Sequence, residues 1–241
     1  MKLINLIVFS CLLAWQQQVY AQSNDCQTLM YDLYRSNKPE KGKVFYTQYD
    51  LRLINASGKI EQESKVEMYL THQQRQIITD AVHLYTDSVY VITIIPAAKT
   101  IAVNYMDEKS RAEYKKIAIG SADSVFFNSM QQESCNDITG NTKYTKEIVY
   151  IAKYKSSGTP KVKYLVNEPL KMIFKMIAYG PDLKSRMEYT YNVLDLDYKN
   201  KNISDISVLY MALNKDGSLL PQYKGYQVND NRITTSKKIK Q

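Results

Sequence analysis

The feature that most limits the fold is a series of short segments between residues 44 and 105 in which apolar and polar residues alternate. A period of two is typical of β-strands that bury one face. The connections have only a few residues, too few for the crossover helices that parallel strands need, so we predict an antiparallel meander. The predicted strands are Val44–Ile54, Lys59–Thr71, Arg75–Thr79, Val82–Thr86, Val89–Ile95 and Thr100–Tyr105.

The alternation also indicates what each face of this sheet meets. From Val66 to Thr71 apolar and polar side chains alternate one by one, which is typical of a sheet with one apolar face. The segment Val89–Ile95 is instead apolar on both faces apart from Thr93. We therefore expect this strand to be covered on both sides, or to have one face that lines a cavity.

Helical periodicity occurs before the meander and again between Met106 and Asp137. The first helix has Asn24 or Asp25 as its cap, and Pro39 ends it. We expect the two later helices to pack over the apolar face of the sheet. The predicted helices are Asp25–Asn37, Asp107–Ile119 and Ser121–Met130.

Beyond Asn141 the strand pattern resumes, with turn residues between the segments. Leu170–Tyr179 also fits a helix by the spacing of its apolar residues, but strands on both sides favour a strand. The predicted strands are Glu147–Lys155, Lys161–Val166, Leu170–Tyr179, Ser185–Asp197 and one near Ile206–Leu213.

Residues 1–21 have the pattern of a secretory signal peptide: Lys2, an apolar run from Leu3 to Trp15, and a small residue, Ala21, at the predicted cleavage site. The apolar run is well short of the roughly 20 residues that cross a bilayer, so a retained membrane anchor is the less favoured alternative. Lipid attachment at Cys11 is a second alternative, although Phe9 and Ser10 fit such a signal poorly. We expect a periplasmic protein, with secretion or envelope association as variants.

Residues 22–241 have a length that one β domain commonly uses, so we predict a single domain. Removing Lys2 with the signal lowers the formal charge from +8 to +7. The basic residues lack the aromatic interleaving of nucleic-acid modules, so we do not expect nucleic acid as a partner.

Two cysteines remain in residues 22–241, Cys26 and Cys135. In an oxidising compartment they can form a disulfide that joins the first helix to the middle of the chain. Two separate thiols are the alternative. Neither cysteine has a neighbour at the spacing of a metal or redox motif.

Motifs that carry chemistry are missing from the sequence. Its glycines form no phosphate-binding loop, and His72 and His83 belong to no metalloprotease motif. Paired carboxylates are not excluded, but nothing marks any pair. We therefore predict a protein that is not an enzyme and has no cofactor or metal. The many tyrosines favour packing in half-buried strands, with a stacking surface for sugars or protein as the alternative.

Two short stretches resemble the periplasmic carriers of the outer-membrane lipoprotein sorting system, the LolA-like proteins. Phe45 and Gln48 are similar to the phenylalanine and glutamine that open the first strand of those carriers. Asp87–Ile92, followed by Pro96 and Lys99–Val103, is similar to their turn, aromatic strand, proline turn and next strand. Ser88 replaces the family's glycine, and Tyr90 stands near where a tryptophan is common. By order of elements the resemblance covers residues 25–213.

The resemblance implies a mainly β (α+β) fold, in which a curved antiparallel sheet forms an incomplete β-barrel around an apolar cavity. An N-terminal helix and inserted lid helices complete it. The candidate cavity residues are Val66, Met68, Leu70, Val82, Leu84, Val91, Ile101 and Val103, and the candidate lid residues are Val125, Phe126 and Met130. Ordinary core packing explains the same residues equally well. A basic residue that grips cargo is not carried over, although Arg52 and Arg75 lie on the expected strands.

The function that the resemblance implies is an exported carrier that shelters the acyl chains of a lipid or lipoprotein. Its partners would be those chains and membrane-bound donor and acceptor proteins, and we expect a monomer. The alternative is a non-enzymatic envelope binding or assembly module that uses the sheet as a platform for a protein or a glycan.

Overall fold

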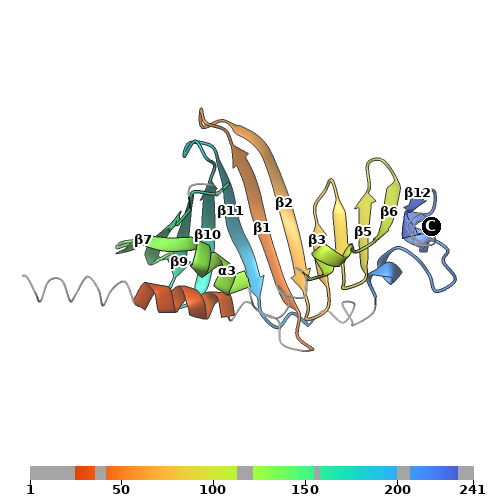
Figure 1. Cartoon of the computed structure of the whole chain (residues 1–241), viewed down its shortest axis with the longest axis horizontal. Coiled ribbons are helices and arrows are strands. Elements are labelled where there is room, and N and C mark those ends of the chain that lie inside the picture. The colour runs from red at the N-terminus through yellow and green to blue at the C-terminus, as the bar shows by residue number, and fades with distance from the viewer. Residues whose placement is uncertain (1–24, 36–41, 113–121, 155–157, 200–206, 233–241) are drawn as a thin grey trace, which may run out of the picture.

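Twelve strands form one curved sheet in the computed structural model, which describes residues 25–35, 42–112, 122–154, 158–199 and 207–232 (Figure 1). The strands are β1 (Phe45–Ile54), β2 (Ile60–Leu70), β3 (Arg75–Ile78), β4 (His83–Thr86), β5 (Tyr90–Ile95), β6 (Thr100–Tyr105), β7 (Met130–Asp137), β8 (Lys146–Ala152), β9 (Lys161–Asn167), β10 (Met172–Tyr179), β11 (Arg186–Asp195) and β12 (Gln227–Asp230). Residues 25–35 and 108–112 are helical, as is α3 (Ala122–Ser129), and two 3₁₀ turns are η1 (Val208–Met211) and η2 (Pro221–Tyr223). The predicted signal peptide lies outside the described residues.

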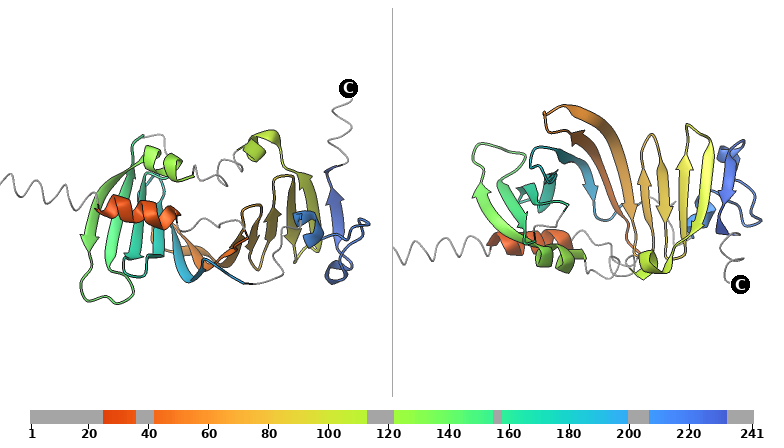
Figure 2. Two further views of the ribbon diagram at one scale, coloured as in Figure 1. Left: turned by 90° about the horizontal axis from the view of Figure 1, so that it is seen from below. Right: turned by 45° about the horizontal axis from the view of Figure 1, so that its top comes forward.

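Two meanders meet in the middle of the sheet. Strands β1 to β6 pair in sequence order, β7 to β11 do the same, and β1 joins the two sets by pairing with β11. In the described part of the chain β7 and β12 each have one neighbour, so the sheet stays open. Figure 2 shows that the sheet is strongly bent, with α3 and helical residues 108–112 on the side toward which it curves. The predicted incomplete barrel is confirmed.

The strands predicted between residues 44 and 105 are all present with small shifts at their ends. The strand predicted over Leu170–Tyr179 is confirmed as β10, which begins at Met172 because Leu170 and Lys171 lie in the turn before it. The predicted first and third helices are confirmed over residues 25–35 and 122–129. Of Asp107–Ile119, residues 108–112 are helical, and 113–119 lie outside the described residues.

Two predictions about the elements are wrong, and one strand was not predicted. Residues 130–137 form β7 instead of continuing a helical region, because they pair with β8 despite a polar sequence of low strand propensity. The strand expected near Ile206–Leu213 is the turn η1, whose apolar residues pack on the sheet and do not pair with it. β12, which the sequence did not indicate, pairs parallel to β6, so the sheet is not wholly antiparallel.

The pairing register shows which side chains share a face, because residues directly opposite on neighbouring antiparallel strands point to the same side. α3 lies on the side toward which the sheet bends, and its Phe127 packs against Tyr150 and Tyr164. The side chains of Tyr150 and Tyr164 therefore point to that side. Crossing from β9 to β2, the residues directly opposite one another are Tyr164, Met176, Tyr189, Leu51 and Ser64. On β2, Val66 and Met68 point to the same side as Ser64. Crossing from β2 to β5, the residues directly opposite one another are Met68, Ile77, Leu84 and Thr93. We call this the concave face and the other the outer face.

The two ends of the sheet are covered on opposite faces. Helical residues 25–35 and α3 cover the concave face of β7–β10, where Met30, Leu33 and Val166 are almost inaccessible. The segment from Val208 to Tyr226 covers the outer face of β4–β6. The middle of the concave face carries neither cover.

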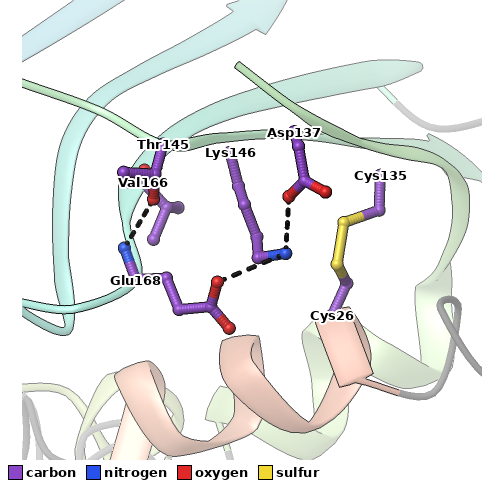
Figure 3. The surroundings of a disulfide bond; sticks show 7 residues. All are labelled: Cys26, Cys135, Asp137, Thr145, Lys146, Val166 and Glu168. Atoms are coloured by element: carbon purple, nitrogen blue, oxygen red, sulfur yellow. Dashed lines mark hydrogen bonds and ion pairs between the residues drawn. A yellow bond between two sulfur atoms is a disulfide. The ribbon is translucent and has the colours of Figure 1, made fainter. Parts of the chain in front are cut away.

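A disulfide between Cys26 and Cys135 ties the first helix to β7, with a Cα–Cα distance of 6.4 Å (Figure 3). The predicted pairing is confirmed. Beside it, the Lys146 ammonium lies 2.8 Å from an oxygen of Asp137 and 3.2 Å from one of Glu168, so it links β7 to the end of β9. Helix, edge strand and sheet are thus joined at one corner.

Asp87, buried in the turn between β4 and β5, fixes the C-terminal segment. One carboxylate oxygen accepts hydrogen bonds from the backbone N–H groups of Val89 and Tyr90, both at 2.7 Å. The other accepts from the Ser207 hydroxyl and the Val208 N–H group, both at 3.0 Å. One side chain therefore closes the turn and anchors η1 to it.

We expect Asp87→Ala to lower the free energy of unfolding by about 1–3 kcal/mol, because it leaves the buried Val208 N–H group without an acceptor. Urea unfolding measures the loss, and hydrogen exchange should quicken first in residues 208–213. Asp80→Ala, at an exposed position in the preceding turn, is the matched control and should change stability by less than about 0.5 kcal/mol. Equal stability of the two variants would contradict the anchoring role.

Candidate functional site

The candidate site is the middle of the concave face, which we call the trough. It is made by apolar side chains of five neighbouring strands that are half-buried, except for the buried Val66. The trough residues are Leu51 and Leu53 of β1, Val66, Met68 and Leu70 of β2, Ile77 of β3, Leu84 of β4 and Val91 of β5.

Strand alternation explains why the trough can be apolar and yet open. On β5, Ile92 and Ile94 point to the outer face and are fully buried beneath η1. Val91 and Thr93 point the other way and stay half-buried. The outer face therefore supplies the packing that holds β5 in place, and its concave face need not be covered for the strand to be stable.

Three tyrosines form the part of the concave face between the trough and the core under α3. The Tyr49 ring centroid lies 5.8 Å from that of Tyr189 and 5.6 Å from that of Tyr191. Burial raises the pKa of all three hydroxyls; nearby Tyr189 adds to the rise at Tyr49, whereas the positive charge of Arg75 opposes it. The three side chains are therefore neutral at physiological pH and add no negative charge to the trough.

The structure separates the cavity residues that the sequence grouped together. Val66, Met68, Leu70, Leu84 and Val91 do share the concave face, and Val82 precedes β4 on the turn that leads into it. Ile101 and Val103 lie on the outer face, opposite Ile94 and Ile92, and are fully buried in the core under η1. The face on which each residue lies depends on how the strands pair, and the sequence pattern does not define that pairing.

The candidate lid residues lie at the other core. Phe126 and Met130 pack in the cluster formed by the first helix and β8–β9, with the Phe126 ring 5.2 Å from that of Tyr150. The side chain of Val125 lies outside the described residues. In this structure α3 therefore covers β7–β10, beside the trough.

The two arginines on the expected strands point to different faces. Arg75 lies opposite Leu70 and Thr86 on the concave face, and its guanidinium has no carboxylate within ion-pair distance among the described residues. Arg52 is on the outer face, where it forms an ion pair with Glu63 at 2.7 Å. Arg75 is thus a cation on the same face as the trough.

Two further observations concern metal binding and membrane-spanning helices in the described ranges. No group of three or more His, Cys, Asp or Glu residues there is arranged to hold a metal ion. None of the helices described is long and apolar enough to cross a membrane.

No family model and no curated protein matches the sequence. Among solved structures, the chain is similar to an uncharacterized conserved protein of Thermus thermophilus, with a TM-score of 0.49 and 6% identity over 86% of this chain and 99% of the other. It is also similar to LprF of Mycobacterium bovis, with a TM-score of 0.40 and 11% identity over 73% and 96% of the two chains.

A third similar structure is a LolA superfamily protein of Nitrosomonas europaea, with a TM-score of 0.32 and 8% identity over 73% of this chain and 96% of the other. All three TM-scores are below 0.5.

Proposed function

We propose that this protein is an exported, non-enzymatic carrier that shelters the acyl chains of a lipid or lipoprotein in the trough. The observation that carries the proposal is a concave apolar surface, made by Met68, Ile77, Leu84 and their neighbours, that stays half-exposed. Apolar side chains that share one face of a sheet and stay partly exposed are suited to bind an apolar ligand.

The chemistry of the trough suits an acyl chain. Burying a methylene group gains about 0.8 kcal/mol, so a long acyl chain has a large free energy to gain from leaving water. The aliphatic side chains of the trough and the neutral tyrosines beside it, Tyr49, Tyr189 and Tyr191, offer an uncharged surface for that burial. Arg75, on the same face, supplies a cation for an anionic group at the head of such a lipid.

The test is mass spectrometry of the protein purified from an envelope fraction, under native and denaturing conditions, with organic extraction of any bound lipid. We expect an acyl-bearing species in stoichiometric amount, released on denaturation. A clean mass equal to residues 22–241, with no affinity for added fatty acid or lipopeptide, would contradict the proposal.

The second candidate function is a platform for a protein or glycan, and a tyrosine cluster on the outer face favours it. The ring of Tyr46 lies 4.7 Å from those of both Tyr69 and Tyr198, and all three are half-buried. Aromatic faces of this kind stack on sugars and on partner side chains. Tyr46→Ala should abolish binding to a glycan array under this alternative and leave lipid loading unchanged under the first.

A further inference from the structure

Figure 1 shows β7 as the outermost strand at one end of the sheet. A recess of about 540 Å³ lies along this strand. All seven residues from Met130 to Asn136 line it, together with Gln27 of the first helix, Phe127 of α3, and Tyr150 and Lys153. Successive side chains of a strand point to opposite faces, so a space that touches all seven must lie alongside the strand's edge. In the described structure β7 pairs only with β8, so the N–H and C=O groups on that edge have no neighbouring strand.

Two buried polar atoms belong to residues that line this recess. Tyr150 is 1% exposed, and its hydroxyl oxygen has no hydrogen-bond partner in the described part of the chain; the same holds for Oε1 of Gln132. The two residues are directly opposite each other on β8 and β7. Buried polar groups are normally paired, so a ligand that brings both a donor and an acceptor would satisfy them.

The charged groups near the recess already have partners. Glu133 forms an ion pair with Lys161 at 2.9 Å, and the Lys153 ammonium donates a hydrogen bond to the Phe127 carbonyl at 3.0 Å. What remains in the lining is neutral: amides, hydroxyls, the disulfide and apolar side chains. The recess therefore suits an uncharged polar group.

We propose that the free edge of β7 binds an extended peptide segment of another protein, which adds to the sheet as a further strand and places an amide or hydroxyl side chain against Gln132 and Tyr150. Strand addition uses the unpaired backbone groups for affinity and a side-chain pocket for selectivity. The proposal does not depend on lipid binding in the trough.

A second copy of this chain is a poorer occupant of the same edge. Two β7 edges related by a two-fold axis would place both concave faces on the same side of the joined sheet. The helix that Cys26 ties to β7, and α3 next to it, would then meet their counterparts above the joint. A peptide carries no such cover.

The test is selection of a random twelve-residue peptide library on phage against residues 22–241 with the disulfide intact. We expect enriched peptides that, as synthetic peptides, slow hydrogen exchange of the amides of residues 130–137. Their binding should be lost when alternate backbone nitrogens of the peptide are methylated, because methylation blocks strand pairing.

Three variants locate the site. Gln132→Leu and Tyr150→Phe should each weaken binding about tenfold, the equivalent of one hydrogen bond, while Tyr150→Phe keeps the ring packing. Gln76→Leu is the matched control: its buried amide nitrogen also has no partner among the described residues, but it lies on β3, and binding should not change.

Three results would overturn the proposal. The first is that no selected peptide slows hydrogen exchange in residues 130–137. The second is that N-methylated peptides bind as tightly as the unmodified ones. The third is that these amides are protected without any peptide and that the protein has the mass of a dimer.

Discussion

Met68→Arg is expected to weaken acyl-chain binding by at least about 100-fold, or roughly 2.7 kcal/mol, because it places a charge in the trough where a lipid chain would lie. Met68 is on the concave face of β2, opposite Thr47 and Ile77, and is half-buried. A bound acyl chain would remove water from the arginine guanidinium, and this loss of hydration costs free energy. Titration of the delipidated protein with a fluorescent fatty acid measures the loss.

A matched control separates this effect from damage to the fold. Val193→Arg puts the same side chain at a 39% exposed apolar position on the outer face of β11, opposite Gln48 of β1, and should bind lipid normally. Leu84→Arg, in the trough on another strand, should repeat the loss. Both trough variants must keep the circular dichroism spectrum of the wild type. Normal lipid binding by a folded Met68→Arg protein would show that the trough is not the site.

The meander could be predicted because the residues that form its turns are recognisable from the local sequence. The turn at Asn55–Gly58 lies between two alternating segments, and Gly58 has the positive φ of +84° that favours glycine. The disulfide followed from there being only two cysteines beyond the predicted signal peptide. Neither inference required knowledge of which segments pair in space.

The faces and the edges could not be predicted, since they depend on pairing between strands. Alternation shows that Ile101 and Val103 share a face, but only the register opposite Ile94 and Ile92 shows that it is the outer one. β7 has a polar sequence and is a strand because β8 offers it a partner. The apolar residues of η1 are buried by packing, which a strand-like sequence pattern does not distinguish from pairing.

The opposite covering of the two ends explains how an apolar trough can persist in water. Helical residues 25–35 and α3 bury the concave face of β7–β10, and the segment anchored by Asp87 buries the outer face of β4–β6. Each end therefore has its own core, and neither needs the trough to be filled. The middle strands are held by pairing with both ends, so their stability does not depend on either of these covers.

Replacing both cysteines, Cys26→Ser with Cys135→Ser, is expected to lower the free energy of unfolding by about 2–5 kcal/mol. The bond spans 109 residues of sequence, so its loss frees much of the unfolded chain, and it also releases the helix from the corner at β7. Leu29, Met30 and Leu33 still hold the helix on the concave face, so the protein should remain folded.

Urea unfolding of residues 22–241 measures this loss, with the reduced wild type as the matched control. Because reduction breaks the same bond, the wild type in dithiothreitol should unfold at the midpoint of the double variant, and the double variant should not respond to the reductant. Without reductant, a maleimide should label no thiol in the unfolded wild-type protein. Labelling of both cysteines, or equal unfolding midpoints for the oxidised and reduced wild type, would show that the bond does not form or contributes nothing to stability.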